Sequence, residues 1–295
     1  MKMDIRKNHE LRLKAFDLLN KLKGKGLSTK EAVDKIHYEF GVPLTTLRHW
    51  YYGSYNPFGR RGELTYKPEL FYVLGALLGD GCLYNWKITN NLIILVGDKK
   101  FTTKYAYMLS LCVGRLVKPY IIRSKNVWSV TTNNFKLYSL FKKIREDLSY
   151  LEEIMQQTEK HSLLLFIEGF FDAEGCVKII KEEVRITPKI CLDMTNTNKE
   201  ILDLIQKLLK DTLSIDAKYS IQKADGIKNK QVAYHLRVYK KEYVKKFLEN
   251  ISTTKLKPEK INYVEKWLKR KNKSTLQLDC SFLQPASNLL HSTTL

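Results

Sequence analysis

Apolar side chains gather in two stretches of similar pattern, residues 73–81 (VLGALLGDG) and 167–175 (IEGFFDAEG). Each run is typical of a buried helix and ends in an acid followed by glycine. Small residues four apart, Gly75 with Gly79 in one stretch, share a helical face on which a second backbone can approach closely. Gly169 and Ala173 repeat this stripe, so we expect the two helices to cross against each other.

The same order of elements follows both stretches. Gly81 and Gly175 stand where left-handed caps end helices, and alternating patterns after them predict strands. We expect strands near residues 82–88, 92–96, 116–123, 126–132, 177–180 and 185–195, a hairpin turning at 225–226, and helices near 99–113, 135–148, 199–209, 241–251 and 258–271. The chain is therefore predicted to be α+β, with an αββαββα unit duplicated about a pseudo-twofold axis.

Three shorter helices are predicted before this duplication, at residues 9–23, 28–40 and 44–52. The third leaves four polar side chains outward, as in the recognition helix of a helix-turn-helix: Thr45, Thr46, Arg48 and His49. The alternative is a three-helix bundle that only supports the next domain. The predicted order is a helix-turn-helix-like domain at 1–53, a basic linker at 54–65, two halves at 66–158 and 159–272, and a poorly ordered tail at 273–295.

Charge narrows the choice of partner. Lys and Arg number 51 against 31 Asp and Glu, and a net charge of +20 favours a polyanion such as nucleic acid. No apolar run approaches the roughly 20 residues of a membrane span and no signal peptide opens the chain, so we expect no membrane partner and an intracellular location, in cytoplasm, nucleoid or an organelle. The 5 cysteines show no metal-binding spacing, and Cys82 and Cys176 are expected to be small buried side chains.

The predicted helix crossing would bring Asp80 and Glu174 together, at helix ends whose dipoles disfavour carboxylates. A divalent cation would compensate such a pair. Mg²⁺ prefers few carboxylates and keeps several waters, so one acid from each half and a scissile phosphate form a plausible set for phosphodiester hydrolysis. Asp172 and Glu168 lie at other helical angles from Glu174, so these acids are expected to be structural or to support the metal ligands from behind. The first half has Leu78 where Asp172 stands.

The doubled motif resembles the paired motifs of the LAGLIDADG homing endonucleases in their single-chain form, over roughly residues 66–270. The resemblance implies saddle-shaped antiparallel sheets and a monomer. It also implies Mg²⁺, with Mn²⁺ as a substitute, held by Asp80 and Glu174, with the carbonyls of Gly79 and Ala173 as further ligands.

The resemblance implies two further polar positions in each half. A basic residue at the end of the last strand matches Lys240 in the second half, but Asn133 or Asn134 stands at the comparable place in the first. A polar residue on the second strand would fall near Asp193 and Leu95, and leucine lacks the required group. We therefore expect the two DNA strands to be cut at different rates.

Base reading is expected from strand residues that point into the major groove of double-stranded DNA, and a basic linker would follow phosphates. Candidates are Arg60, Arg61, Trp86, Lys87, Arg123, Lys125, Lys178, Lys181, Arg185, Lys189, Lys218, Gln222, Lys223 and Arg237. The predicted function is a site-specific, Mg²⁺-dependent DNA endonuclease. The alternative is a binder of the same fold that does not cut, acting as an intron RNA maturase or a transcription regulator.

Overall fold

A computed structural model describes residues 9–54, 57, 63–86, 90–180, 189–224 and 231–269. Its contacts divide the chain into two units, Met1–Lys257 and Pro258–Leu295. The second unit contains one described helix, α11 (Pro258–Lys269). None of the helices that the structure describes has both the length and the apolar character of a membrane span. The predicted linker residues 60–61, the hairpin turn at 225–226 and the tail at 273–295 lie outside the described residues.

The first three helices form a small bundle with its own core, built around Leu19, Ile36, Leu47 and Trp50. Their bounds are α1 (His9–Gly24), α2 (Thr29–Phe40) and α3 (Leu44–Tyr51). A capping box at Ser28 begins α2, as the sequence pattern indicates. Gly41, at φ 67°, ends α2 in the left-handed conformation, and residues 41–43 separate it from α3. The bundle thus contains two helices joined by a short glycine turn.

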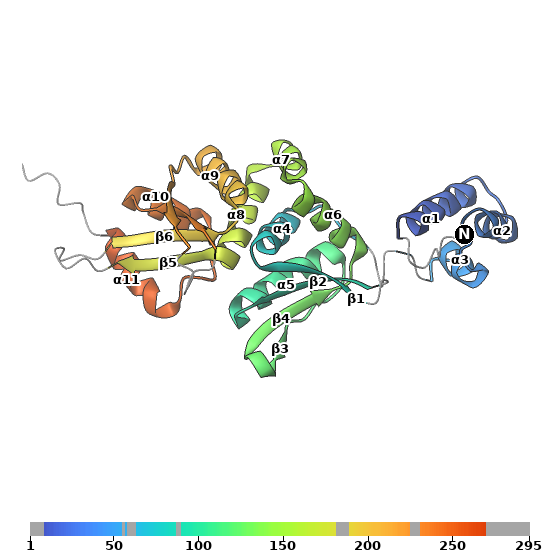
Figure 1. The fold of residues 1–295 in the computed structure, drawn as a ribbon, viewed down its shortest axis with the longest axis horizontal. Helices are drawn as coiled ribbons and strands as arrows, with labels where there is room; N and C mark the ends of the chain where they lie inside the picture. The colour runs from blue at the N-terminus through green and yellow to red at the C-terminus, as the bar shows by residue number, and fades with distance from the viewer. Residues whose placement is uncertain are drawn as a thin grey trace, which may run out of the picture. The chain divides into compact units, whose positions relative to one another are not determined.

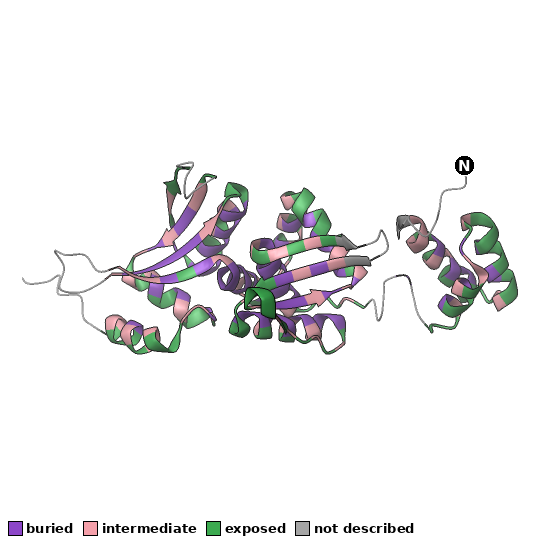
Figure 2. Cartoon of the chain, turned by 60° about the horizontal axis from the view of Figure 1, so that its bottom comes forward, coloured by how far each residue is buried: buried purple, intermediate pink, exposed green. Residues whose placement is uncertain are grey.

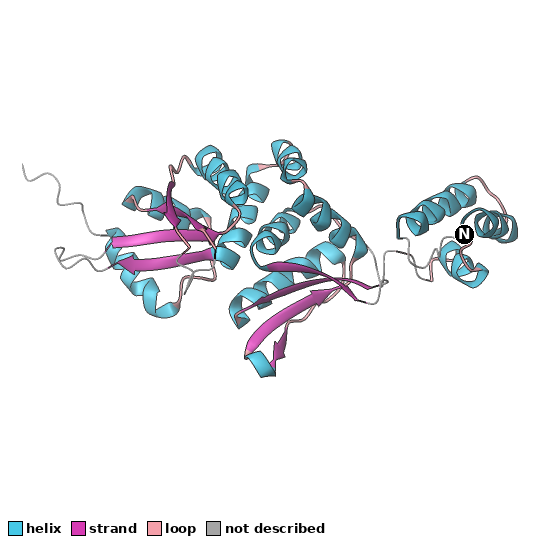
Figure 3. Ribbon diagram, viewed as in Figure 1, coloured by secondary structure: helices cyan, strands magenta, loops and turns pink. Residues whose placement is uncertain are grey.

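Both halves of the remaining chain repeat one topology (Figures 1 and 3). The first half contains α4 (Pro68–Asp80), β1 (Gly81–Trp86), β2 (Asn90–Gly97), α5 (Lys99–Val113), β3 (Tyr120–Ile122), a 3₁₀ turn η1 (Arg123–Lys125), β4 (Val127–Thr132) and α6 (Phe135–Glu146). The second contains α8 (Lys160–Glu174), β5 (Gly175–Ile180), β6 (Lys189–Asn196), α9 (Lys199–Leu213), β7 (Lys218–Gln222), β8 (Ala233–Val238) and α10 (Lys241–Asn250). The predicted α+β fold with duplicated αββαββα units is confirmed.

One helix was missed by the sequence pattern. We expected a single helix near residues 135–148, but α6 ends at Glu146 and α7 (Leu148–Gln156) begins at once. Asp147 separates them, because its carboxylate accepts hydrogen bonds from the backbone and hydroxyl of Ser149 and caps the new helix. In the second half an irregular segment, residues 251–257, follows α10 before the next helix begins, and this difference matters at the site described below.

Helices α4 and α8 cross at very short range and bury their facing sides (Figure 2). A Cβ atom added at Gly75 would lie 2.1 Å from the carbonyl oxygen of Phe166, and one added at Gly169 would lie 2.1 Å from that of Tyr72. Any larger residue would therefore push the helices apart. The predicted crossing along small residues agrees with this geometry.

The prediction of left-handed caps at Gly81 and Gly175 is wrong. Gly81 has φ −80° and Gly175 has φ −85°, both in extended backbone, because each strand begins directly after the acid. Glycine is needed there for space instead. An added Cβ would lie 2.4 Å from the carbonyl oxygen of Leu77 or Phe171, one turn earlier in the same helix.

Each half forms a four-stranded antiparallel sheet, in the orders β1-β2-β4-β3 and β5-β6-β8-β7. The registers correspond: Gly81 is paired with Leu95 in the first sheet, and Gly175 with Met194 in the second. Helices α4, α5 and α6 lie on one side of the first sheet (Figure 1), and the strand residues facing them are buried: Ile93, Leu95 and Val130. The opposite face of each sheet is called its open face below.

Candidate metal centre and nucleic-acid interface

The crossing brings the two predicted acids together. An added Cβ at Gly79 would meet Ala173 Cβ at 2.5 Å and Glu174 Cγ at 2.8 Å, so the last turns of α4 and α8 are in contact. Burial, and then the charge of Asp80, raise the pKa of Glu174 to about 7. Desolvation by the surrounding protein also raises the pKa of Asp80, although this side chain is still accessible to solvent. Two carboxylates in such surroundings favour a bound cation or a bound proton.

A lysine that the sequence reading missed lies beside this pair. Lys255 Nζ donates a hydrogen bond to the carbonyl oxygen of Ala173 at 3.0 Å, and its positive charge offsets part of the rise in the pKa of Asp80 and Glu174. Lys255 comes from an irregular segment after α10, which we call the strap (residues 251–257). No periodicity marks a loop residue of this kind, so only the folded chain identifies it.

Buried acids of α8 hold the strap in place. Asp172, fully buried, accepts hydrogen bonds from Thr253 Oγ1 at 2.7 Å and from the backbone N–H of Thr254 at 2.6 Å. Glu168 accepts one from the backbone N–H of Ser252 at 2.9 Å. Asp172 and Glu168 thus order the residues directly before Lys255.

Two further groups complete this polar network. Lys104 of α5 lies 2.6 Å from Glu168 and 3.0 Å from Asp172, and it also donates to the backbone carbonyl of Ser252. Tyr72 of α4 donates its hydroxyl hydrogen to Asp172 at 2.8 Å. Because every member has a charged or hydrogen-bonded partner, the buried acids are compensated.

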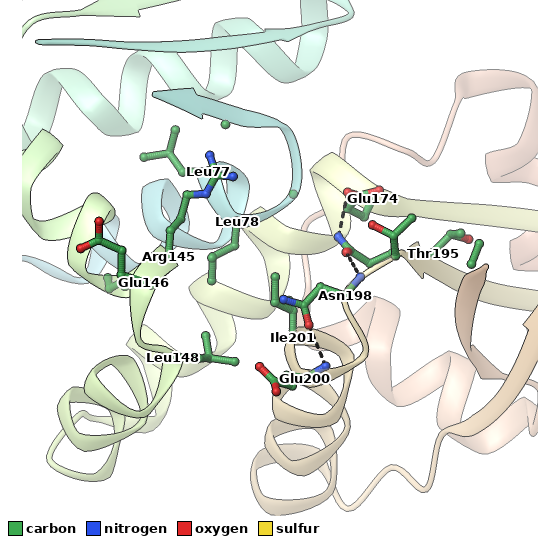
Figure 4. A pocket seen from close by; sticks show the side chains of 16 residues that line it. Leu77, Leu78, Arg145, Glu146, Leu148, Glu174, Thr195, Asn198, Glu200 and Ile201 are labelled. Atoms are coloured by element: carbon green, nitrogen blue, oxygen red, sulfur yellow. Dashed lines mark hydrogen bonds between the residues drawn. The ribbon is translucent and has the colours of Figure 1, made fainter. Parts of the chain in front are cut away.

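The strap and its network cover one side of the crossed helices α4 and α8, and a cavity lies on the other side (Figure 4). A cavity of about 550 Å³ is bordered by α4, α6, α8 and α9, and Leu78 lies at the position that corresponds to Asp172. Its polar lining includes Arg145, Glu146, Glu174, Asn198 and Glu200. At its rim Asn196 Nδ2 donates to Glu174 Oε1 at 3.0 Å, so an amide orients this carboxylate. By strand register the counterpart of Asn196 in the first half is Gly97, which has no side chain to offer Asp80.

Lys240 does not lie beside Asp80 and Glu174. Strand β8 runs antiparallel to β6, so its first residues lie beside the end of β6 next to Glu174, and Val238 pairs with Leu192 farther away. Lys240 follows Val238 and caps α10; its ammonium lies 4.9 Å from the ring centre of Tyr243. In the first half Asn134 holds the same N-cap position before α6, where its side chain accepts a hydrogen bond from the backbone N–H of Leu137. The structure therefore matches these two positions to each other but does not bring them to the acids.

The open face of the second sheet gathers the predicted strand contacts. Asp193, paired with Cys176 and Arg237, is buried on this face, and it binds Lys178, Arg237 Nε at 3.4 Å and His235 Nδ1 at 3.1 Å. Strand alternation puts the other predicted residues of these strands on the same face: Lys189, Lys218 and Gln222. This surface thus carries several cations ordered by one buried acid.

The strand pairing corrects one expected correspondence between the two halves, that of Leu95 with Asp193. Cys82 pairs with Ile94, and Cys176 pairs with Asp193, so Ile94 and not Leu95 is the counterpart of Asp193. Leu95 points into the core, because a shift of one residue moves a side chain to the other face. The first half still lacks a polar group there. The two cysteines are exposed on the open faces, so their prediction as buried side chains is wrong.

The remaining predicted contacts fall into three groups. Arg123 and Lys125 are exposed on η1, at the tip of the β3–β4 hairpin, and Lys223 is exposed just after β7. On α3, Thr45, Arg48 and His49 are exposed and Thr46 is half-buried, as the outward face requires. The positions outside the described residues, or whose side chains are not described, are Arg60, Arg61, Trp86, Lys87, Lys181 and Arg185.

Comparisons with known proteins find a matching family model and several similar proteins. A family model described as a LAGLIDADG-like domain matches residues 162–252. The uncharacterized protein MJ0398 of Methanocaldococcus jannaschii is 26% identical over 258 residues, 81% of this chain and 88% of that relative. The crystal structure of I-DmoI in complex with DNA and Ca is 19% identical and has a TM-score of 0.46, covering 67% of this chain and 97% of that one. Full-length DUF199/WhiA from Thermatoga maritima is 17% identical with a TM-score of 0.45, over 74% of this chain and 64% of that one.

Proposed function

The chain belongs to the LAGLIDADG family, and on that premise we propose that it is a site-specific homing endonuclease that hydrolyses double-stranded DNA with a divalent metal ion. The observation that carries the proposal is the contact between the ends of α4 and α8, which places Asp80 beside Glu174. Both halves come from one chain, so a monomer supplies the complete pair. The basic open face of the second sheet supports duplex DNA as the partner.

The residues present fit a hard divalent cation. Oxygen donors are the ligands that Mg²⁺ prefers, and the two carboxylates together with the carbonyl of Gly79 are of this kind. The carbonyl of Ala173, also expected as a ligand, accepts the hydrogen bond of Lys255 instead. The described residues contain no group of three or more His, Cys, Asp and Glu side chains that could hold a metal ion. Water molecules and phosphate oxygens would therefore complete the coordination, which suits a site that must admit DNA.

The bound metal would activate water and neutralise charge that develops on the phosphate. The protein contributes the placement of the other groups. Asn196 orients Glu174 through its hydrogen bond, and Lys255 holds a positive charge next to the same carboxylates. We assign to Lys255 the stabilisation of the negative phosphoryl transition state, the role expected of Lys240.

A binder that does not cut, whether an intron RNA maturase or a transcription regulator, is the second candidate. A half-buried acid pair repels itself and gains nothing from nucleic acid, whose phosphates are also negative. A protein that only binds would be more stable without these two charges. The pair is therefore better explained by metal-dependent hydrolysis.

The experiment begins with selection of cleavable sites from a random duplex library with Mg²⁺. Asp80→Asn and Glu174→Gln should then abolish cleavage of a selected site while retaining binding, because phosphate contacts supply most affinity. Glu146→Gln, which changes an acid of the adjacent cavity, is the matched control and should cut normally. Cleavage by either site variant at the parental rate would overturn the assignment. Binding by the parent without cleavage of any duplex would favour the second candidate.

The three-helix bundle adds a second reader in this proposal. Its glycine turn between α2 and α3 and the exposed Arg48 and His49 suit a helix-turn-helix that places α3 in the major groove. Deletion of residues 1–62 should leave a folded core that cuts but binds more weakly. Circular dichroism and equilibrium binding measure the two properties. An unfolded truncation would show that the bundle supports the core instead.

A further inference from the structure

The open faces of the two sheets differ in charge at three matched positions around Asp193. In the second sheet, Lys178, Asp193 and Arg237 form a charged cluster. Register puts Tyr84, Ile94 and Thr131 at the corresponding positions of the first sheet. The described open-face residues of the first sheet's strands are all uncharged: Cys82, Tyr84, Leu92, Ile94, Val96, Tyr120, Ile122, Val127, Ser129 and Thr131.

Most of these side chains are at least partly accessible, unlike those on the helix side of the same sheet, although Ser129 is buried. The exposed fraction is 44% for Tyr84, 37% for Val96 and 48% for Tyr120, whereas Ile93 and Leu95 are buried beneath the helices. A row of exposed apolar side chains on an open sheet is costly in water and is typical of a surface that contacts a partner. The surface continues from the carboxylate pair, since β1 begins directly after Asp80.

Two of the polar side chains on this face already bind each other. Tyr120 and Thr131 are joined by a hydrogen bond of 2.8 Å between their hydroxyl groups. Cations lie at the edge instead, where Arg123 and Lys125 are exposed on η1 and suit phosphate contacts. The face therefore meets base edges mainly with aliphatic and aromatic carbon, and few donors or acceptors remain for direct readout.

Only one of the four bases presents a methyl group in the major groove. Thymine carries its C5 methyl there, whereas guanine and cytosine present acceptors and a donor. Those polar groups would lose water against Ile94 and Val96 without gaining a partner, which weakens binding. We propose, on the basis of the proposed DNA-binding function, that the open face of the first sheet reads a thymine-rich half of the target through its methyl groups. The charged second sheet reads the other half by hydrogen bonds.

The test uses the full chain without divalent metal, so that binding is measured apart from cleavage. Duplexes selected by binding should be rich in thymine in one half. Replacing thymine by uracil, which lacks only the methyl group, should weaken binding in that half by about fourfold for each contacted methyl. The same replacement in the other half should leave the Kd unchanged.

Two variants test which sheet is responsible for the loss of affinity in uracil duplexes. Ile94→Thr keeps a β-branched residue in the strand and should reduce the loss caused by uracil, whereas Lys178→Ala, on the second sheet, should retain it in full. Circular dichroism checks that both variants are folded. Equal Kd values for thymine and uracil duplexes, or no enrichment of thymine, would overturn the inference. So would a parental dimer that Ile94→Lys dissociates, since the face would then bind a second copy of this chain.

Cleavage distinguishes this inference from the proposed function. Mg²⁺-dependent cutting of sites that are insensitive to uracil would leave the nuclease proposal intact and remove the inference. Thymine-dependent binding without cutting would do the opposite.

Discussion

Corresponding residues of the two halves differ most where they surround the crossed helices. Asp172 of α8 binds the strap, whereas Leu78 of α4 borders a cavity of about 550 Å³. Asn196 binds Glu174, whereas Gly97 stands at the corresponding position near Asp80. Strand order and register are nevertheless the same in both sheets. Symmetry is thus retained where backbone pairing and burial require it and is lost among side chains near the acids.

The end of each half explains part of this difference. After α10 the chain continues as the strap, which carries Lys255 to the carboxylates, whereas after α6 Asp147 starts α7 immediately. The helix pair is therefore closed on one flank by a lysine-bearing segment and open on the other. If this asymmetry serves catalysis, changes on the strap should matter more than matched changes elsewhere.

The largest effect is expected from Lys255→Met, which removes the ammonium group beside the acids and keeps a side chain of similar length. Cleavage should slow by about 10² to 10⁴, the usual contribution of one positioned acid, base or charged group. Single-turnover rates on a selected duplex measure this loss. Lys240→Met is the matched control, because that exposed lysine lies against Tyr243, and its rate should stay near the parental value. The opposite ranking would restore the role first expected of Lys240.

The two flanks should also differ in stability. Asp172→Ala removes an acceptor for four hydrogen-bond donors and leaves Lys104 without one of its partners, which should cost about 3 kcal/mol. Leu78→Ala, at the matched position beside an existing cavity, should cost about 2 kcal/mol, at the low end for a core leucine. Urea denaturation measures both free energies of unfolding. A greater loss for Leu78→Ala would mean that the strap network contributes little to folding.

The sequence predicted the features that depend on local pattern. The doubled apolar helices, the small residues between them and the alternating strands follow from spacing alone, and so did the pairing of Asp80 with Glu174. The register of the strands could not be predicted from spacing, because Ile94 and Leu95 are both apolar. Only the strand pairing shows which of the two faces the core. Lys255 was missed for a related reason: it lies in an irregular segment whose course is fixed by buried acids far away in the sequence.

A smaller effect is expected on the order of strand cutting. Because only Glu174 has an amide partner at the matched position, the two scissile phosphates should react at different rates, and nicked circles should accumulate first from a supercoiled plasmid. Asn196→Ala should slow the step served by Glu174 by about tenfold, as is usual when a group that orients a metal ligand is lost. Simultaneous cutting of both strands, unchanged in this variant, would show that the asymmetry has no kinetic role.

The smallest effect concerns the salt dependence of binding, which tests the two sheets at one matched position. Lys178 lies on β5 where Tyr84 lies on β1, and only the lysine can displace a counterion from a phosphate. Lys178→Ala should therefore reduce the slope of log Kobs against log salt concentration by about 0.9, the value for one phosphate contact. Tyr84→Ala should lower affinity without changing the slope. Since Asp193 already binds Lys178, a slope unchanged by Lys178→Ala would mean that this charge is spent inside the protein, and phosphate contacts would then have to come from cations at the sheet edges.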